Sequence, residues 1–337
     1  MNMALLELPP LTLSRYRFTL TADDPMLLPP YKGSTLRGGF GYAFKRMVCF
    51  QPEVQTCSDC LLRYTCPYAY VFETATPPDA EVLSKNAHAP RPIVIQAPEE
   101  ELTTYFPGDS LEFHVILIGR AQQYLPYFLV AFQELGRQGL GRFLDLPGGR
   151  RRGRYHLEQV EAVDALADTH ALVYDAAQPT HIHAQALPVD AARVTAYAQT
   201  LSPDRLTVKF LTPTRLQHEE RLVREGPPFA ALIKTLLGRI SSLAYFHCGE
   251  RWETDFRGWI DRAQAIALAE TGTVWVDWDR YSGRQQQRVE MGGLVGQATY
   301  TGNLAPFLPL LALGTLTHVG KGAIFGNGRF SIENAAL

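Results

Sequence analysis

Four cysteine residues lie within one short stretch of the sequence, at Cys49, Cys57, Cys60 and Cys66. Clustered thiols in a reducing compartment are typical of metal ligation rather than disulfides, and four thiolates suit a tetrahedral zinc ion. The two-residue gap between Cys57 and Cys60 lets both sulfurs reach one ion. A catalytic zinc would keep an open position, so the pattern predicts a structural zinc in a small insertion over residues 49–66. An iron–sulfur or redox role and unliganded cysteines are the alternatives.

A glycine-rich segment near the end of the chain could hold an anion. Gly320, Gly322, Gly326 and Gly328 surround Lys321 between residues 317 and 330. Glycine allows positive φ and close approach of a ligand, and successive N–H groups can bind an anion. The spacing does not match a nucleotide-binding P-loop or a Rossmann turn. The segment is therefore predicted to cradle an RNA phosphate backbone, with a tight turn as the alternative.

Two other segments contain side chains that suit RNA recognition. Residues 136–154 are rich in glycine and arginine, which predicts a flexible cationic segment that contacts phosphates through Arg150, Arg151 and Arg152. A solvated loop is the alternative. Residues 277–287 place aromatic and arginine planes beside amides, which can stack on bases and bind their edges. The contacts predicted there are Arg280, Tyr281, Arg284 and Gln285.

Three residues are candidates for proton transfer. Tyr42 and Lys45 are three positions apart on the face of a predicted helix that lies opposite its apolar stripe, so both could act on one phosphodiester. An ordinary solvated face is the alternative. His318 directly precedes the glycine-rich segment, and its ordinary pKa near 6.5 suits proton exchange. His247 matches the apolar phase of its helix and is predicted to lie in a core.

The elements that must position these residues occur in the same order twice. In the first half, strands are predicted at 14–20, 92–96, 111–118 and 154–163, with helices at 34–48, capped by Ser34 and Thr35, and at 121–135. In the second half, strands are predicted at 205–211, 274–278, 288–300 and 323–332, with helices at 227–246 and 306–313. Both halves are therefore β-α-β-β-α-β.

This order predicts an α+β fold of tandem ferredoxin-like (RRM-like) domains. The N-terminal domain would span residues 1–165 with the cysteine insertion, and the C-terminal domain residues 204–337 with the glycine-rich loop. Residues 166–203 show little periodicity and are predicted to be a connector or insertion.

Composition limits the class of protein. The 337 residues include 32 Lys+Arg and 34 Asp+Glu, a net charge of −2, which argues against coating nucleic acid with the whole surface. The hydrophobic fraction of 46% excludes disorder for most of the chain. No stretch is apolar enough for a membrane helix, and no signal peptide is recognisable. We therefore expect a cytoplasmic protein with no membrane partner.

Five motifs in one order resemble a known family. They are Leu36-Arg37-Gly38-Gly39-Phe40-Gly41, the cysteine cluster ending in Cys66-Pro67-Tyr68, Leu211-Thr212-Pro213-Thr214-Arg215-Leu216, Trp278 with Arg280-Tyr281-Ser282-x-Arg284-Gln285, and His318-Val319-Gly320-Lys321-Gly322-x-x-Phe325-Gly326-x-Gly328. Together they resemble the CRISPR-associated RAMP proteins that process precursor CRISPR RNA, in the cysteine-containing branch. The matches extend over residues 36–330.

The resemblance implies a metal-independent endoribonuclease that cleaves within CRISPR repeat RNA. In the family mechanism the substrate's own 2′-OH attacks the adjacent phosphorus and leaves a 2′,3′-cyclic phosphate and a 5′-OH. The glycine-rich loop would contact RNA, as would Arg37 in the first motif. Zinc would be structural, with no catalytic metal. The expected partner is repeat RNA, with a CRISPR effector complex and a homodimer as further options.

One departure from the family pattern concerns the general base. Many relatives carry a catalytic histidine on or just after the first helix, whereas this helix has Tyr42 and Lys45, and the next histidine is His88. Either Tyr42, Lys45 and His318 share the proton transfers, or the protein binds RNA and cuts slowly or not at all. The alternative function is a non-catalytic RAMP subunit that holds guide RNA in an effector complex.

Overall fold

The chain forms two compact units in the computed structural model, which describes residues 5–54, 56–77, 80–82, 89–167, 169–183, 185–282 and 287–334. One unit contains residues 13–188, and the other contains residues 1–12 together with 189–337. The sequence predicted divisions near residues 165 and 203, whereas the units change at Thr12 and at Pro188. The first residues of the chain therefore belong with its second half.

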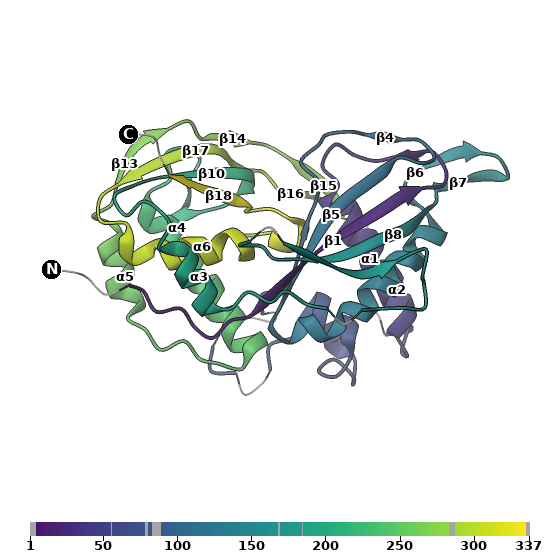
Figure 1. Cartoon of the computed structure of the whole chain (residues 1–337), viewed down its shortest axis with the longest axis horizontal. Coiled ribbons are helices and arrows are strands. Elements are labelled where there is room, and N and C mark those ends of the chain that lie inside the picture. Colours follow the sequence, from purple (N-terminus) through teal and green to yellow (C-terminus); the bar gives the residue numbers. More distant parts are fainter. Residues whose placement is uncertain are drawn as a thin grey trace. The chain divides into compact units, whose positions relative to one another are not determined.

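The unit of residues 13–188 is built on a five-stranded antiparallel sheet of order β3-β5-β1-β8-β9 (Figure 1). Its strands are β1 (Leu13–Ala22), β3 (Ile93–Gln96), β5 (Ser110–Ile118), β8 (Tyr155–Val163) and β9 (His170–Asp175). Its helices are α1 (Gly33–Val48) and α2 (Leu125–Gln138), preceded by a 3-10 turn at Gly119–Tyr124. When β9 is left out, the order of elements along the chain is the predicted β-α-β-β-α-β. Within the sheet, the first of these four strands lies between the third and the fourth.

Both helices of this unit pack on one face of the sheet, as alternating burial along β1 requires. Phe40 of α1 lies between Phe128 and Phe132 of α2, with ring centroids at 4.5 and 4.8 Å. Phe18 of β1 contacts Phe132 at 5.1 Å, so aromatic rings join the helices to the sheet. This core fixes the direction in which the outer face of α1 points.

Three local predictions for this unit are wrong. Helix α1 begins at Gly33 with Lys32 as its N-cap, because Ser34 and Thr35 lie inside the first turn and make no cap. The arginine segment is not a flexible loop, because it forms a hairpin of β6 (Leu140–Leu146) and β7 (Gly149–Gly153). The segment predicted as a connector includes β9, which pairs with β8.

The remaining short strands of this unit, β2 (Met26–Leu27) and β4 (Thr104–Tyr105), pair with each other.

The second unit repeats the arrangement with a sheet of order β13-β17-β10-β18, in which β14 also pairs with β17. Its strands are β10 (Arg205–Thr214), β13 (Ala267–Thr271), β14 (Val274–Val276), β17 (Gly293–Thr301) and β18 (Phe330–Asn334). Its helices are α3 (Ala191–Ala198), α4 (Phe229–Leu243), α5 (Phe256–Ala263) and α6 (Leu308–Thr317). Outside this sheet, β11 (Gln217–His218) pairs with β12 (Arg221–Leu222), and β15 (Asp279–Ser282) pairs with β16 (Gln287–Glu290).

Two features of this unit differ from the sequence-based predictions. The predicted strand over 323–332 is a 3-10 turn at Ala323–Phe325 followed by a shorter strand, β18. Helix α3 lies in the stretch predicted as a connector. The predicted opening of α4 by Pro227-Pro228 is confirmed, since Pro228 is its N-cap. By length and composition the helical stretch Phe229–Cys248 could cross a membrane, but most of it is buried within the protein, as in a core helix.

The segment before β1 is tied to residues far along the chain. The backbone N–H of Leu6 donates to the carbonyl of Pro306 at 3.0 Å. The indole Nε1 of Trp252 donates to the carbonyl of Glu7 at 3.1 Å. Leu6 is only 1% exposed. These contacts explain why residues 5–12 belong with the second half of the chain.

Candidate nucleic-acid interface

The outer face of α1 presents Tyr42 and Lys45 as predicted. Tyr42 is 60% exposed because the apolar stripe of Leu36, Phe40 and Phe44 faces the core. The guanidinium of Arg46 lies 5.7 Å from the Tyr42 ring centroid, and the Lys45 ammonium lies 5.9 Å from that of Tyr68. An exposed phenol and two cations one turn apart can bind and polarise a phosphodiester. Arg37, one turn earlier, is half-buried with its guanidinium 4.9 Å from the Phe72 ring centroid.

His318 lies in the interior of the second unit and is 0% exposed. Its backbone has a φ of 61°, and its Nδ1 is 3.0 Å from the carbonyl oxygen of Asn327. This contact joins the two ends of the glycine-rich loop. Arg239 of α4 donates from Nε to the carbonyl of Thr317 at 2.9 Å, and burial lowers the pKa of Arg239 to about 10, so it remains a cation at neutral pH. No pattern in the sequence marks Arg239, because α4 also carries Lys234 and nothing in the spacing of the two cations separates them.

The glycine-rich loop does contain the backbone conformation that its sequence predicted. Gly320, Gly322, Gly326 and Gly328 all have positive φ, between 72° and 88°. A Cβ on Gly328 would lie 1.7 Å from the carbonyl oxygen of Val319, and one on Gly320 would lie 2.5 Å from that of Arg215. These two glycines are therefore required by the packing of the loop itself. Lys321 is exposed at the loop surface, where a ligand can reach it.

The β6–β7 hairpin separates the three arginines that the sequence grouped together. Side chains alternate between the two faces of a strand, and Arg152 pairs with Phe143 while Arg150 pairs with Asp145. Arg150 and Arg152 are exposed, and the Arg152 guanidinium lies 4.7 Å from the Phe143 ring centroid. Arg151 points to the other face and binds Asp24. Arg150 and Arg152 are thus available to a phosphate, whereas Arg151 is engaged within the protein.

Two of the residues predicted to read bases fall on the β15–β16 hairpin. Arg280 and Tyr281 belong to β15, where Tyr281 pairs with Arg288 of β16. Arg284 and Gln285 lie outside the described residues, as does His88. The strand pairing places the described part of this segment in a hairpin.

The four cysteines do not form a metal centre among the described residues, where no group of three or more His, Cys, Asp or Glu side chains is arranged to hold an ion. Cys49, Cys57 and Cys66 are close enough to influence one another electrostatically, since burial and the charges of Glu73, Cys66 and Cys49 raise the pKa of Cys57. Cys60 instead donates from Sγ to Oε1 of Gln51 at 3.2 Å. The zinc insertion is not shown by this geometry.

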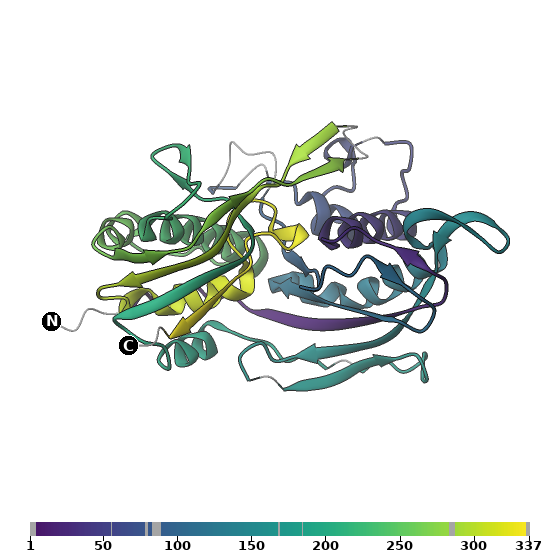
Figure 2. The ribbon, with the colours of Figure 1, turned by 90° about the horizontal axis from the view of Figure 1, so that it is seen from above.

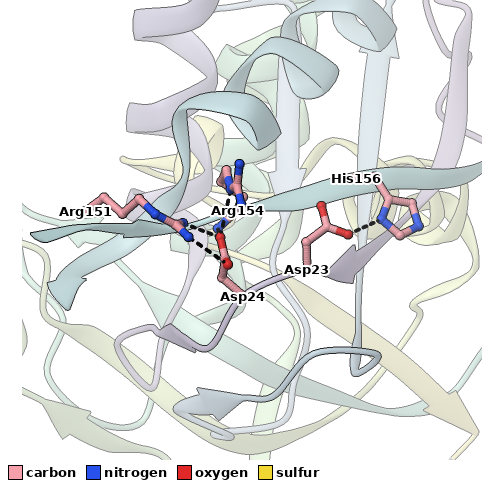
Figure 3. Close-up of polar contacts among 5 residues, drawn as sticks. All are labelled: Asp23, Asp24, Arg151, Arg154 and His156. Carbon is pink, nitrogen blue, oxygen red and sulfur yellow. Dashed lines mark hydrogen bonds and ion pairs between the residues drawn. The ribbon is translucent and has the colours of Figure 1, made fainter. Parts of the chain in front are cut away.

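A polar cluster around the start of β8 was not foreseen from the sequence (Figure 3). The Asp24 carboxylate binds Arg151 and accepts from Nε of Arg154 at 2.9 Å and from the Arg154 backbone N–H at 3.1 Å. The Arg151 contact and the other hydrogen bonds hold the pKa of Asp24 well below its usual range. The ring of His156 lies between carboxylates, with Nδ1 2.7 Å from Asp23 and Nε2 2.8 Å from Glu158.

This cluster borders an open groove of about 530 Å³ in the first unit. Arg137 and Arg154 contribute positive charge to the groove, Asp23 contributes negative charge, and His156 lines it between them. Burial alone would lower the pKa of His156, but its bonds to Asp23 and Glu158 outweigh burial and raise it. No spacing in the sequence signals this cluster, because Asp23 and His156 meet only through the pairing of β1 with β8.

Two family models match the chain and together extend over most of its length. Residues 10–187 match the AF_1859_N N-terminal domain, and residues 208–330 match the CRISPR-associated endoribonuclease Cas6. The second match contains the glycine-rich loop. The chain therefore contains a domain of the AF_1859_N family and, in its second half, a region that matches the Cas6 model. This confirms the resemblance to CRISPR RNA-processing proteins, while the cysteine-containing branch stays a prediction.

Solved Cas6 structures share this fold at low sequence identity. A partial Cas6-RT-Cas1–Cas2 complex matches with a TM-score of 0.57 and 15% identity over 99% of this chain and 48% of that chain. A Cas6 product complex matches with a TM-score of 0.55 and 14% identity over 95% of this chain and 100% of the other. A Thermus thermophilus Cas6 matches with a TM-score of 0.51 and 14% identity over 96% and 99%. This chain therefore spans about half of the first relative's length. No curated protein sequence matches the chain.

Proposed function

We propose that this protein is the endoribonuclease that cuts CRISPR precursor RNA within its repeats to give guide RNA. The observation that carries the proposal is the Cas6 match over residues 208–330. Exposed cations support it, since RNA affinity is dominated by phosphate contacts: they are Arg46 of α1, Lys321 of the glycine-rich loop, and Arg150 and Arg152 of the β6–β7 hairpin. One similar structure is described as a Cas6 product complex, which fits a nuclease of this class.

The proposed reaction is an internal transfer at one phosphodiester. The 2′-oxygen forms a bond to phosphorus while the bond from phosphorus to the 5′-oxygen breaks. A base takes the proton of the 2′-OH and an acid gives one to the 5′-oxygen, which leaves a 2′,3′-cyclic phosphate and a 5′-OH. Tyr42 and Lys45 are proposed for these proton transfers, and Lys321 is proposed separately to bind a phosphate of the RNA.

The test is a cleavage assay with the cognate repeat RNA in EDTA, followed by analysis of the ends. We expect cutting at one position, with cyclic phosphate and 5′-OH ends. Binding of repeat RNA without any cutting would instead favour the non-catalytic RAMP subunit that holds guide RNA. Cutting that requires a divalent ion would contradict the metal-independent mechanism.

Tyr42→Phe tests the proposed site most cleanly because it removes one hydroxyl and keeps the exposed ring. We expect single-turnover cleavage to slow by at least about 10²-fold with little change in RNA affinity. His318→Ala is expected to slow cleavage as well, but through the shape of the glycine-rich loop, because the buried His318 ring contacts Asn327 at the end of that loop. His318 is buried against Asn327, so that variant needs a melting measurement beside the rate. Wild-type rates in folded forms of both variants would reject these assignments.

We infer that the protein also associates with a CRISPR complex in the cytoplasm, where precursor RNA is made. Two similar structures are described as Cas6-RT-Cas1–Cas2 complexes, which supports such an association. Co-purification with the neighbouring CRISPR proteins would test this association. We expect high salt to separate the proteins again. A homodimer is the further option and would be detected by its mass in solution.

We also infer a structural zinc held by Cys49, Cys57, Cys60 and Cys66. The short gap between Cys57 and Cys60 supports it. Cys60 would have to exchange its contact with Gln51 for the metal. Metal analysis of freshly purified protein should give one zinc per chain, and Cys60→Ser should lower the melting temperature. Cys248→Ser is the matched control, and protein without zinc would contradict the inference.

A further inference from the structure

The β6–β7 hairpin combines an exposed aromatic ring with exposed cations. Phe143 is 55% exposed although it is large and apolar. It lies directly opposite Arg152, whose guanidinium is 4.7 Å from the ring centroid. Arg142 and Arg150 are exposed nearby, with Asp145 as the one acidic residue of the two strands. Single exposed apolar residues are common on proteins, but an aromatic ring among arginines is the usual platform for an unpaired base.

The base of the hairpin is held in place by tight backbone packing and by Asp24. A Cβ on Gly141 would lie 2.4 Å from the carbonyl oxygen of Leu27, and one on Gly153 would lie 2.2 Å from that of Pro25. Asp24 follows β1 and binds both Arg151 of the hairpin and Arg154 just beyond it (Figure 3). The hairpin projects from the body of its unit in both views (Figures 1 and 2). It is therefore an arm with a fixed base.

We propose that this arm is an additional RNA-binding site, in which Phe143 and Arg152 stack on an unpaired base of the RNA while Arg150 binds the neighbouring phosphate. Asp24 is a positioning residue that sets the arm through Arg151 and Arg154. The proposal rests on the proposed function, since it assigns a contact to the same RNA. It differs from the prediction made from the sequence, because Arg151 anchors the arm and the aromatic ring carries the base contact.

Phe143→Ala tests the stacking contact. Loss of a base stacked on an aromatic ring should weaken binding of repeat RNA by about fivefold or more, and Phe143→Trp should retain the affinity. Phe106→Ala is the matched control, because Phe106 is 62% exposed in the same unit and lies outside the hairpin. Equal affinities for wild type, Phe143→Ala and Phe106→Ala would overturn the stacking site.

Asp24→Asn tests whether Asp24 anchors the arm, because the two possible effects on RNA affinity have opposite signs. Removing a negative charge near a polyanion site should strengthen RNA binding, whereas loosening the arm should weaken it by about two- to tenfold. We expect weakening for Asp24→Asn and no weakening for Asp23→Asn, which removes the same charge from the adjacent residue. Stronger binding by folded Asp24→Asn would overturn the anchoring role.

The two proposals fail in different ways. If the wild type binds and cuts repeat RNA and the arm variants bind it with the same affinity, the proposed nuclease function stands and the arm is not an RNA-binding site. If the wild type binds no repeat RNA in the same titration, both the proposed function and the arm are rejected. Melting curves of each variant exclude loss of affinity through unfolding.

Discussion

At the scale of single residues, glycine occurs in two different physical situations in this chain. Gly328 has a φ of 72°, and a Cβ there would overlap the carbonyl oxygen of Val319, whereas a Cβ on Gly38 of α1 would have nothing within 4 Å. Glycine in the first case is required by the backbone, and in the second it only weakens a helix. A run of glycines in a sequence does not distinguish the two.

We predict opposite effects for alanine at these two positions. Gly328→Ala should lower the free energy of unfolding by about 1–3 kcal/mol or more, because the added carbon overlaps a carbonyl oxygen and the φ is unfavourable. Gly38→Ala should raise it by about 0.5–1 kcal/mol through helix propensity. Urea denaturation of both variants gives the comparison, and stabilisation by Gly328→Ala would show that the loop is arranged differently.

His156 makes a pH-dependent contribution to stability. Its pKa is raised in the folded protein through Asp23 and Glu158, although burial opposes this. The pKa of His156 is therefore higher in the folded protein than in the unfolded chain, where it is near 6.5. Its stabilisation is complete at a pH below the unfolded-chain pKa and is lost as the pH rises through the pKa of the folded protein. The free energy of unfolding should therefore differ more between wild type and His156→Gln at pH 6 than at pH 9. A difference that grows with pH would contradict this sign.

At the scale of elements, the strand alternation of the β6–β7 hairpin decides which arginines meet RNA. Replacing Arg150 by Gln should reduce the slope of log affinity against log salt by about 0.7, since each single-strand phosphate contact contributes about 0.7. Arg151→Gln should change that slope less and lower the melting temperature more, because Arg151 binds Asp24. Equal salt-dependence slopes for the two variants would contradict the prediction that RNA contacts only one face of the hairpin.

The regular elements were predictable from the sequence because their patterns are local. Alternation along β1 and the apolar stripe of α1 give strand and helix without knowledge of the rest of the chain. The β6–β7 hairpin was missed because glycine and arginine have weak strand preference, and its pairing depends on close packing against Leu27 and Pro25. Asp24, Arg154 and His156 were missed for a related reason: they meet through strand pairing across more than a hundred residues.

At the scale of the whole molecule, the early residues of the chain should stabilise a distant part of it. Leu6 is buried, and its N–H binds the carbonyl of Pro306. Leu6→Ala should lower the free energy of unfolding by about 2–4 kcal/mol. Amide exchange should increase within residues 189–337 rather than within residues 13–188. Leu5→Ala is the matched control, because Leu5 is 40% exposed. Exchange that rises only near the mutation would contradict the assignment of these residues to the second unit.

That connectivity also sets the order in which the chain can fold during synthesis. Residues 13–188 form a compact unit that the ribosome completes first. Residues 5–12 emerge before it, yet their partners Trp252 and Pro306 are made much later. The segment must therefore wait without its partners while nearly the whole chain is translated, and closing so long a loop is slow. Residues 5–12 can then dock only after Pro306 has been synthesised, and slowing translation after residue 188 should lengthen the time during which a protease can cleave this segment.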